Sequence, residues 1–375
     1  MNRHTLTRQR RQTGFTLIEL MVGVLLGMLT ILVIAQVMVI SESRKRTATS
    51  GSDAQLSGAL ATYAVQREVQ MAGYGVSNNP AALGCTVQFK TTSAPAGTFT
   101  LAPVVITAGT NGSSVLTTLR SQKTSFALSL VLTSPHALGD DHFTVQSTLG
   151  VDPGDLLIAI PLTPSSTSPC KVIQASSDAT TSSIPQAVVA SAPWNQATAA
   201  TIPPTVDFPS KSYVINVGSL VLRQYSMDAA THTLQLSDLS GVDGTWSAAQ
   251  SVQSEVVMFK ALYGKDTDAN GQVDQFDSVS PTDSAGWQQV ISVRIMVVTR
   301  STQYEKEAVG SGDPLLWDLG TSDITVIDSN AQTCKTSHRC ISVALSYLGD
   351  DWSHYRYKVF ETQIPLRNVL WNSTD

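Results

Sequence analysis

The sequence contains no charged residue between Leu20 and Ile40, in a chain of which 14% is Asp, Glu, Lys or Arg. A helix over residues 15–40 would be about 39 Å long at about 1.5 Å per residue, and the hydrocarbon core of a bilayer is about 30 Å thick. An apolar run of this length is typical of a transmembrane helix. We therefore expect this segment to cross a membrane, in preference to the alternative of a buried helix in a soluble protein.

Acidic residues are also absent ahead of Glu19. Residues 1–14 contain four arginines and no acid, which is typical of the polar leader of a targeting segment. A secretory signal is cut after its apolar region, whereas the small-residue junction here, Gly14-Phe15, precedes that region. Cleavage between Gly14 and Phe15 would leave the apolar helix on the mature protein.

Glu19 itself is the one acid at the edge of the span. A charge at the centre of a bilayer costs about 2.5–3.5 kcal/mol on insertion scales, and charges within membrane spans usually serve a function. Glu19 lies about one turn from the start of the helix, where this cost is smaller. We therefore expect Glu19 to have a functional role.

The motifs of common enzyme classes are missing. The chain has no G-x-S-x-G, H-E-x-x-H, P-loop or G-x-G-x-x-G pattern, and its six histidines are scattered without ligand spacing. The net charge is −5 and no basic stripe occurs beyond the flanks of the span, which argues against nucleic acid as a partner. We expect a non-catalytic protein that requires no cofactor, with His136 and His142 in loops or on a sheet surface.

Cysteine is scarce, and its spacing favours disulfides over a metal site. The four cysteines lack a C-x-x-C pair, so two disulfides are the favoured interpretation and buried free thiols the alternative. Of the three connectivities we favour Cys85 with Cys170 and Cys334 with Cys340, because this pairing closes a compact loop. By loop-closure entropy the first bridge is worth about 4.6 kcal/mol and the second at most about 2.4 kcal/mol.

Proline is absent before Pro80, so one helix is plausible from Phe15 to about Ala72. Beyond the membrane an apolar stripe recurs at helical spacing, and we expect it to pack on a sheet. Gly73 and Gly75 are expected to end the helix. The stripe consists of Leu56, Leu60 and Tyr63 with Ala59 and Ala64, while Asp53, Gln55, Gln66 and Glu68 are expected to face away from the sheet.

The remaining chain alternates short apolar runs with loops rich in Ser, Thr, Pro and Gly, which predicts a β-rich head. The expected fold is α+β, with a long N-terminal helix packed on a large antiparallel head. The expected parts are the leader (1–14), the transmembrane half of the helix (15–40), its exported half (41–75) and the head (76–375). Candidate strands are 126–132, 142–147, 156–160, 213–217, 220–225, 290–299, 341–345 and 357–366, with a long polar loop over 161–209.

One acidic segment of the head has the spacing of an EF-hand loop, which wraps oxygen ligands around a hard cation. Calcium is the natural candidate, with weak affinity because the last position is Asp instead of Glu. A metal-free polar turn is the alternative interpretation. The candidate ligands are Asp266, Asp268, Asn270, the carbonyl of Gln272, Asp274 and Asp277.

The segment Gly14-Phe15-Thr16-Leu17-Ile18-Glu19-Leu20 resembles the start of the type IV pilins and pseudopilins. The resemblance implies that a prepilin peptidase cuts after Gly14 and methylates the new amine of Phe15. It also implies that Glu19 pairs with the amine of a neighbouring subunit. A pair of opposite charges is stable in lipid only when both are present, so such a pair would check subunit registration.

Within this family the chain resembles the PilW-type minor pilins at three places: Met71-Ala72-Gly73-Tyr74-Gly75, Leu262-Tyr263-Gly264-Lys265-Asp266, and residues 356–368. The resemblance implies a structural subunit that initiates or caps a type IV pilus, with other minor and major pilins, prepilin peptidase and inner-membrane lipid as partners. It implies that the protein is first held in the bacterial inner membrane with its head in the periplasm and then becomes part of the pilus. A minor pseudopilin of a type II secretion system and a membrane-anchored periplasmic enzyme or adhesin are the alternatives.

Overall fold

The computed structural model describes residues 14–123, 129–137, 139–195, 208–310 and 314–370. Most of the predicted leader, residues 1–13, therefore lies outside the described residues. The chain divides into two compact units, Met1–Ser52 and Asp53–Asp375. Helix α1 (Leu17–Met71) contributes to both units, which are described separately below.

In the first unit, α1 carries the predicted apolar span. It is the one helix among the described residues that is long and apolar enough to cross a membrane. Its apolar side chains from Leu17 to Ile40 are exposed in the isolated chain, as expected for a surface that meets lipid or other helices.

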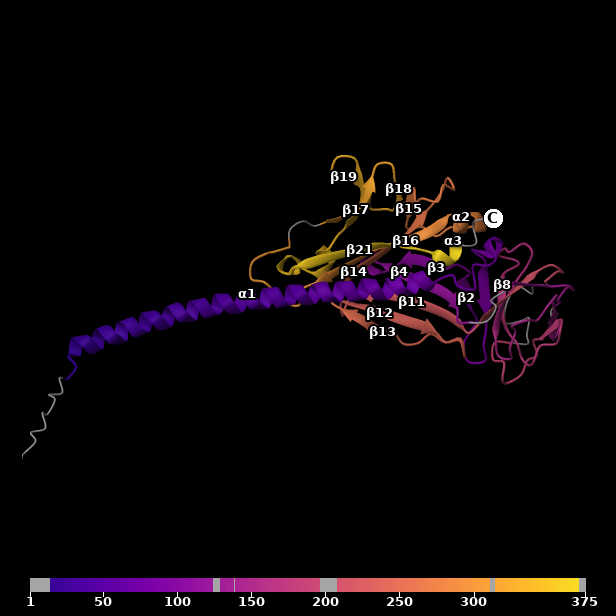
Figure 1. Cartoon of the computed structure of the whole chain (residues 1–375), viewed down its shortest axis with the longest axis horizontal. Coiled ribbons are helices and arrows are strands. Elements are labelled where there is room, and N and C mark those ends of the chain that lie inside the picture. Colours follow the sequence, from indigo (N-terminus) through magenta and orange to yellow (C-terminus); the bar gives the residue numbers. More distant parts are fainter. Residues whose placement is uncertain (1–13, 124–128, 138, 196–207, 311–313, 371–375) are drawn as a thin grey trace, which may run out of the picture. The chain divides into compact units, whose positions relative to one another are not determined.

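In the second unit, the last part of α1 packs with one face against two sheets (Figure 1). One has the strand order β13 (Gln250–Ser254), β12 (Thr233–Leu239), β11 (Leu220–Asp228), β4 (Ser114–Ser121) and β3 (Val104–Ala108). The other has the order β18 (Thr325–Ile327), β15 (Gln275–Asp277), β14 (Val256–Lys265), β16 (Val290–Arg300) and β21 (Tyr357–Pro365). Both sheets and one face of the helix share one apolar core.

The helix face that enters this core is not the predicted one. Leu56, Leu60 and Tyr63 are 61%, 49% and 62% exposed, and the expectation that they pack on a sheet is wrong. The buried face has helical spacing but small side chains: Ala54, Gly58, Ala61, Val65, Val69 and Ala72. Small side chains let a helix approach two sheets closely, whereas the large ones would keep it away.

Gly58 shows how close this approach is. A Cβ atom added there would lie 1.9 Å from the ring of Phe360, on β21. The helix then ends as predicted, since Gly73 and Gly75 have positive φ angles of 82° and 72°. Asn368, on α3 (Arg367–Leu370), donates a hydrogen bond of 2.9 Å to the carbonyl of Ala72 at this end.

Glu68 is also buried, contrary to the prediction that it faces away; only 3% of it is exposed. Its Oε1 accepts a hydrogen bond from Arg120 Nε on β4 at 3.2 Å, and its Oε2 accepts one from Arg223 Nη1 on β11 at 2.8 Å. Arg223 also binds Asp238 on β12 at 2.8 Å. The carboxylate thus fixes the rotation of the helix against three strands. Burial and the negative charge of Glu68 raise the pKa of nearby Tyr225 to about 12.

A further six-stranded sheet forms a lobe at the end of the head where α1 ends (Figure 1), with the order β2 (Gly97–Thr100), β1 (Thr86–Phe89), β8 (Cys170–Gln174), β7 (Leu156–Ile160), β10 (Tyr213–Gly218) and β5 (Ser129–Val131). Alternate residues of β7 enter two different cores, one of which also contains β6 (His142–Thr144) and β9 (Ser183–Pro185). The Cys85–Cys170 disulfide joins the start of β1 to β8 in this lobe, with the predicted partners.

A small three-stranded sheet completes the head, with the order β17 (Leu315–Thr321), β20 (His338–Val343) and β19 (Ala331–Cys334). Short helices connect the sheets: η1 (Pro80–Ala82), η2 (Thr110–Gly112), α2 (Ser284–Gln288), η4 (Ser346–Leu348) and η5 (Trp352–His354). The α+β class with an antiparallel-rich head is confirmed. The predicted loop over 161–209 is wrong in part, because it contains β8 and β9, and its residues 196–207 lie outside the described residues.

The buried Glu68 leads to a test of the helix anchor. Glu68→Gln removes the charge but keeps the shape, leaving Arg120 and Arg223 without their buried anion. We expect the free energy of unfolding of the head to fall by about 3 kcal/mol, the lower end for a broken buried ion pair, because both arginines are partly exposed. Chemical denaturation of the full chain in detergent would measure this. Arg67→Gln, on the exposed side of the same turn, should change stability by less than about 0.5 kcal/mol.

Candidate functional site

The N-terminal segment places Gly14 and Phe15 ahead of α1, outside its regular structure. Thr16 precedes the first helical residue, and its Oγ1 accepts a hydrogen bond of 3.4 Å from the N–H of Glu19. This is the first half of a capping box, in which a Thr and a Glu three residues later share the free N–H groups of a helix start. The Glu19 carboxylate also benefits from the positive end of the helix dipole. Glu19 therefore has a local role in addition to the predicted one between subunits.

The acidic loop follows β14 and leads into β15. Asp266, Asp268 and Asp274 each offer a carboxylate oxygen, and these three oxygens lie within 4.8 Å of one another. Asp266 accepts hydrogen bonds from the N–H groups of Asn270 at 3.1 Å and Gly271 at 2.7 Å. Burial raises the pKa of Asp266, but these two N–H groups outweigh it and hold the pKa below its usual value.

The predicted ligand set is therefore brought together only in part. Asp277 lies on β15, where its Oδ2 accepts a hydrogen bond of 2.5 Å from Lys265 Nζ, so its charge is already neutralised outside the loop. Asn270 is within the turn, with its Nδ2 2.9 Å from Asp268. Within the described part of the chain, no Lys or Arg forms an ion pair with the three clustered carboxylates. The set that fits a hard cation is Asp266, Asp268 and Asp274, with Asn270 beside them.

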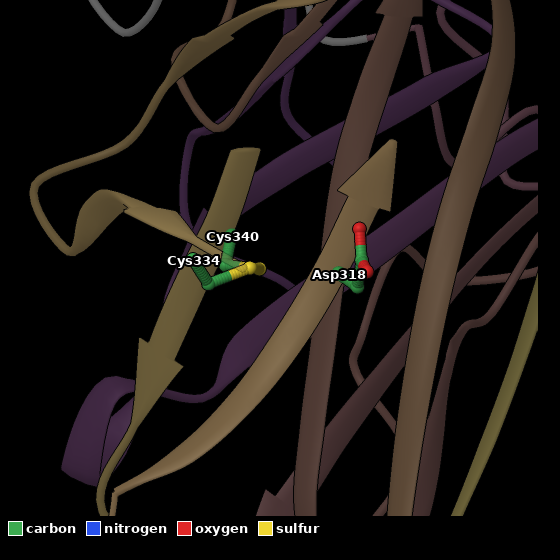
Figure 2. Close-up of side chains that lie close together, drawn as sticks. All are labelled: Asp318, Cys334 and Cys340. Atoms are coloured by element: carbon green, nitrogen blue, oxygen red, sulfur yellow. A yellow bond between two sulfur atoms is a disulfide. The ribbon is translucent and has the colours of Figure 1, made fainter. Parts of the chain in front are cut away.

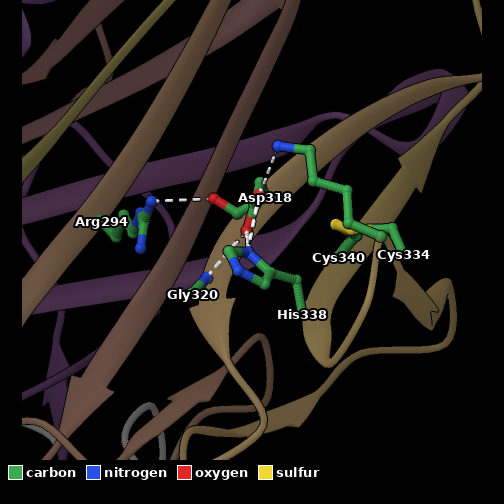
Figure 3. The surroundings of a disulfide bond; sticks show 7 residues. Arg294, Asp318, Gly320, Cys334, His338 and Cys340 are labelled. Atoms are coloured by element: carbon green, nitrogen blue, oxygen red, sulfur yellow. Dashed lines mark hydrogen bonds and ion pairs between the residues drawn. A yellow bond between two sulfur atoms is a disulfide. The ribbon is translucent and has the colours of Figure 1, made fainter.

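The second predicted disulfide, Cys334–Cys340, joins β19 to β20 and has a carboxylate next to it. A carboxylate oxygen of Asp318, on the neighbouring strand β17, lies within 4.8 Å of both sulfur atoms (Figure 2). His338 Nδ1 lies 2.9 Å from both carboxylate oxygens of Asp318 (Figure 3). Lys335 Nζ donates a hydrogen bond of 2.9 Å to Oδ2 of the same carboxylate. These hydrogen bonds hold the pKa of Asp318 well below its usual range.

His136 is a residue whose environment the sequence did not predict, because it is buried and only 7% exposed. Its ring stacks on Phe143 with centroids 3.7 Å apart and meets the edge of Phe208. Neither ring nitrogen has a hydrogen-bond partner among the described residues. Burial lowers the pKa of His136, opposed by the charge of Asp140.

Comparison with known protein families agrees with these features at both ends of the chain. The model of the prokaryotic N-terminal methylation motif matches residues 9–35, and the model of type IV pilus-assembly protein W, PilW, matches residues 217–368. These two matches support a PilW-like type IV pilin. No curated protein and no solved structure shows significant similarity to it.

The PilW match covers the sheet of β14 to β16, β18 and β21, strands β11 to β13 of the other sheet, the acidic loop and the Cys334–Cys340 hairpin. The lobe that contains β1, β2 and β5 to β9, with the Cys85–Cys170 disulfide, lies outside this match. PilW-type pilins are generally structural and non-catalytic, in line with the lack of enzyme motifs.

The buried His136 predicts a pH-dependent stability of the lobe. Its pKa is about 6.5 in the unfolded chain and lower when folded, so below pH 6.5 the unfolded chain binds more protons. Stability should be unaffected by this group above pH 6.5 and should fall as the pH decreases below it, by at most about 1.4 kcal/mol per pH unit.

The free energy of unfolding of the wild type and of His136→Phe, each measured at pH 7 and pH 5, tests this. His136→Phe preserves the aromatic stack and removes the group that titrates. The variant should lose part of the acid sensitivity of the wild type. His142→Gln changes an exposed neighbour and should retain that sensitivity. Equal pH slopes for the wild type and His136→Phe would contradict the prediction.

Proposed function

We propose that this chain is a minor pilin, a non-catalytic subunit that helps initiate or cap a type IV pilus. The observation that carries the proposal is the combination of a methylation-motif leader on an apolar helix with a PilW region at the other end of the chain. In this proposal prepilin peptidase cuts after Gly14 and methylates Phe15. The protein is held in the bacterial inner membrane with a periplasmic head before it enters the pilus.

Assembly in this proposal depends on Glu19. After cleavage each subunit has a positive amine at Phe15, and the apolar surroundings give Glu19 no charged partner among the described residues of its own chain. The amine of a neighbouring pilin supplies the missing charge. Because either charge alone is costly in lipid, only correctly registered subunits would be stable.

The exposed stripe of α1 supports contact with other pilins beyond the membrane. Leu56, Leu60 and Tyr63 are at helical spacing i, i+4 and i+7, and all three point away from the head core. A stripe of this kind is suited to pack against another helix. The same helix would thus bind its own head with small residues and other subunits with large ones.

Glu19→Gln tests the charge pair, because Gln keeps the size of the side chain and removes its charge. We expect incorporation into sheared pili to fall at least about tenfold, which corresponds to a loss above about 1.4 kcal/mol. Thr16→Val is the matched control, since it removes the cap hydroxyl and leaves Glu19 charged. If the two variants lost incorporation equally while remaining in the membrane, Glu19 would act as a helix cap and the proposed pairing would be wrong.

We also propose that the acidic loop binds Ca²⁺ through Asp266, Asp268 and Asp274. Three carboxylates that converge without a neutralising Lys or Arg suit a hard cation with oxygen ligands. The affinity expected for such an extracellular site is a Kd of about 10⁻⁴–10⁻³ M. In this role calcium would fix the connection between β14 and β15, which is a structural role.

Isothermal calorimetry with millimolar Ca²⁺ tests the loop. We expect one site in the wild type, none in Asp266→Asn, and unchanged binding in Asp277→Asn, because Asp277 binds Lys265 outside the cluster. Calcium at about ten times Kd should raise stability by about 1.4 kcal/mol. The absence of heat in the wild type would leave the loop as a metal-free turn.

A minor pseudopilin of a type II secretion system has the same leader and helix. Crosslinking from the stripe residue Leu60 in cells, followed by identification of the captured subunits, distinguishes the two systems. A strain lacking this chain that assembles normal pili but loses an adhesive or chemical activity would instead favour a membrane-anchored adhesin or enzyme.

A further inference from the structure

The head has a small cavity on the side of the β13-β12-β11-β4-β3 sheet that faces away from α1. Leu116 and Tyr225 are paired across β4 and β11 and belong to the core shared with the helix. The next pair on these strands, Thr117 and Gln224, therefore lies on the opposite side, because successive side chains of a strand alternate between its faces. Thr117 and Gln224 both line this cavity, whose volume is about 190 Å³.

The floor of the cavity is a row of side chains that crosses three strands. Thr117 is in the middle of the row, paired with Val105 of β3 on one side and with Gln224 of β11 on the other. Gln224 Nε2 donates a hydrogen bond of 3.5 Å to Thr117 Oγ1, and among the described residues this is the one hydrogen bond of the amide side chain. Its Oε1 and its second N–H are therefore available to a ligand.

The walls of the cavity carry two aromatic rings and two hydroxyl groups. Phe99 of β2 is half-buried, and Trp246, between β12 and β13, is 45% exposed at the rim. A backbone bridge to Leu239 holds Trp246 in place. Within the described residues, neither the Trp246 indole N–H nor the hydroxyls of Thr98 and Thr100 form a hydrogen bond. The lining thus offers flat apolar surfaces beside unused neutral donors and acceptors.

Charge is what the lining lacks. No Asp, Glu, Lys, Arg or His of the described chain lines the cavity. Burial of a phosphate or a carboxylate without an opposite charge is costly, so the lining does not suit an anionic ligand. Pockets for drug-sized molecules have volumes of about 300–1,000 Å³, so a cavity of about 190 Å³ is suited to a single ring.

A sugar ring matches this combination of groups. A neutral hexose has hydroxyls around its edge and C–H groups on its faces, so one face can pack on an aromatic side chain while the edge forms hydrogen bonds. A purely apolar ligand would leave the Gln224 amide and the threonine hydroxyls without partners, which costs free energy when water is excluded. The lining therefore favours a ligand with both kinds of surface.

We propose that this cavity binds one neutral hexose ring, with Trp246 against a face of the ring and Gln224 and Thr117 bound to its hydroxyls. The lining groups are free in the structure as it stands, so binding requires no rearrangement of them. Because Trp246 is at the exposed rim, the ring can be the terminal unit of a longer glycan. The proposal does not depend on a role in pilus assembly.

Saturation-transfer difference NMR with the methyl glycosides of glucose, galactose and mannose tests this binding. The full chain is kept in a zwitterionic detergent, which has no sugar headgroup that would compete. We expect at least one of the three glycosides to bind the wild type with a Kd of about 1 mM, since one sugar ring has few contacting atoms. The corresponding hexuronate should bind at least about tenfold more weakly, because no cation lines the cavity.

Three variants show whether the binding occurs in this cavity. Trp246→Ala removes the exposed ring and Gln224→Met removes the amide at similar size, and each should weaken binding at least about fivefold. Val242→Ala is the matched control, because Val242 is 78% exposed on the same connection between β12 and β13 but does not line the cavity. It should bind as the wild type does. Circular dichroism checks that all three variants are folded.

The proposal is wrong if no glycoside saturates the wild type more than Trp246→Ala, or if Val242→Ala loses as much binding as Trp246→Ala. Equal binding of the hexuronate and the neutral hexoside would also overturn it. A fourth probe, p-cresol, separates the other possible occupant. Displacement of bound glycoside by p-cresol agrees with the proposal, whereas binding of p-cresol without any glycoside would assign the cavity to an aromatic side chain of a protein.

Discussion

The packing of one narrow helix face against two sheets is the constraint on which the head depends. Ala54, Gly58, Ala61 and Val65 are small enough for both sheets to meet the helix in a single core. Glu68 adds a directional contact to this apolar packing, since its two oxygens bind arginines on adjacent strands. Apolar contacts alone would tolerate a small rotation of the helix, whereas a buried carboxylate with two fixed partners does not.

This arrangement determines which surface of the helix is available to other molecules. Because the small residues are used inside the head, the large apolar residues Leu56, Leu60 and Tyr63 are left outside. In a pilin the helix contacts both its own head and other subunits. One face must therefore be buried in the head while the other remains exposed. One of these sheets carries the acidic loop after β14, and the separate three-stranded sheet carries the disulfide hairpin of β19 and β20.

The comparison between sequence and structure is most informative at β14 and β7. The sequence predicted β7, Leu156–Ile160, because a short apolar run with turns on both sides is typical of a buried strand. It did not predict β14, although all ten of its residues are buried. Lys260 interrupts that run, and only the structure shows that this lysine is buried beside Asp328, with Nζ and Oδ2 3.3 Å apart.

The sequence by itself determined the apolar run, the N-terminal motif that precedes it, the glycines that end the helix and the α+β class. These features depend on local composition and on the length of apolar runs, which a linear chain displays directly. The tertiary structure decided which helix face is buried, that Asp277 binds Lys265 instead of joining the acidic loop, and that His136 is enclosed by Phe143 and Phe208. Each of these depends on strands that are distant in the sequence and meet only in the folded head, so no local pattern contains them.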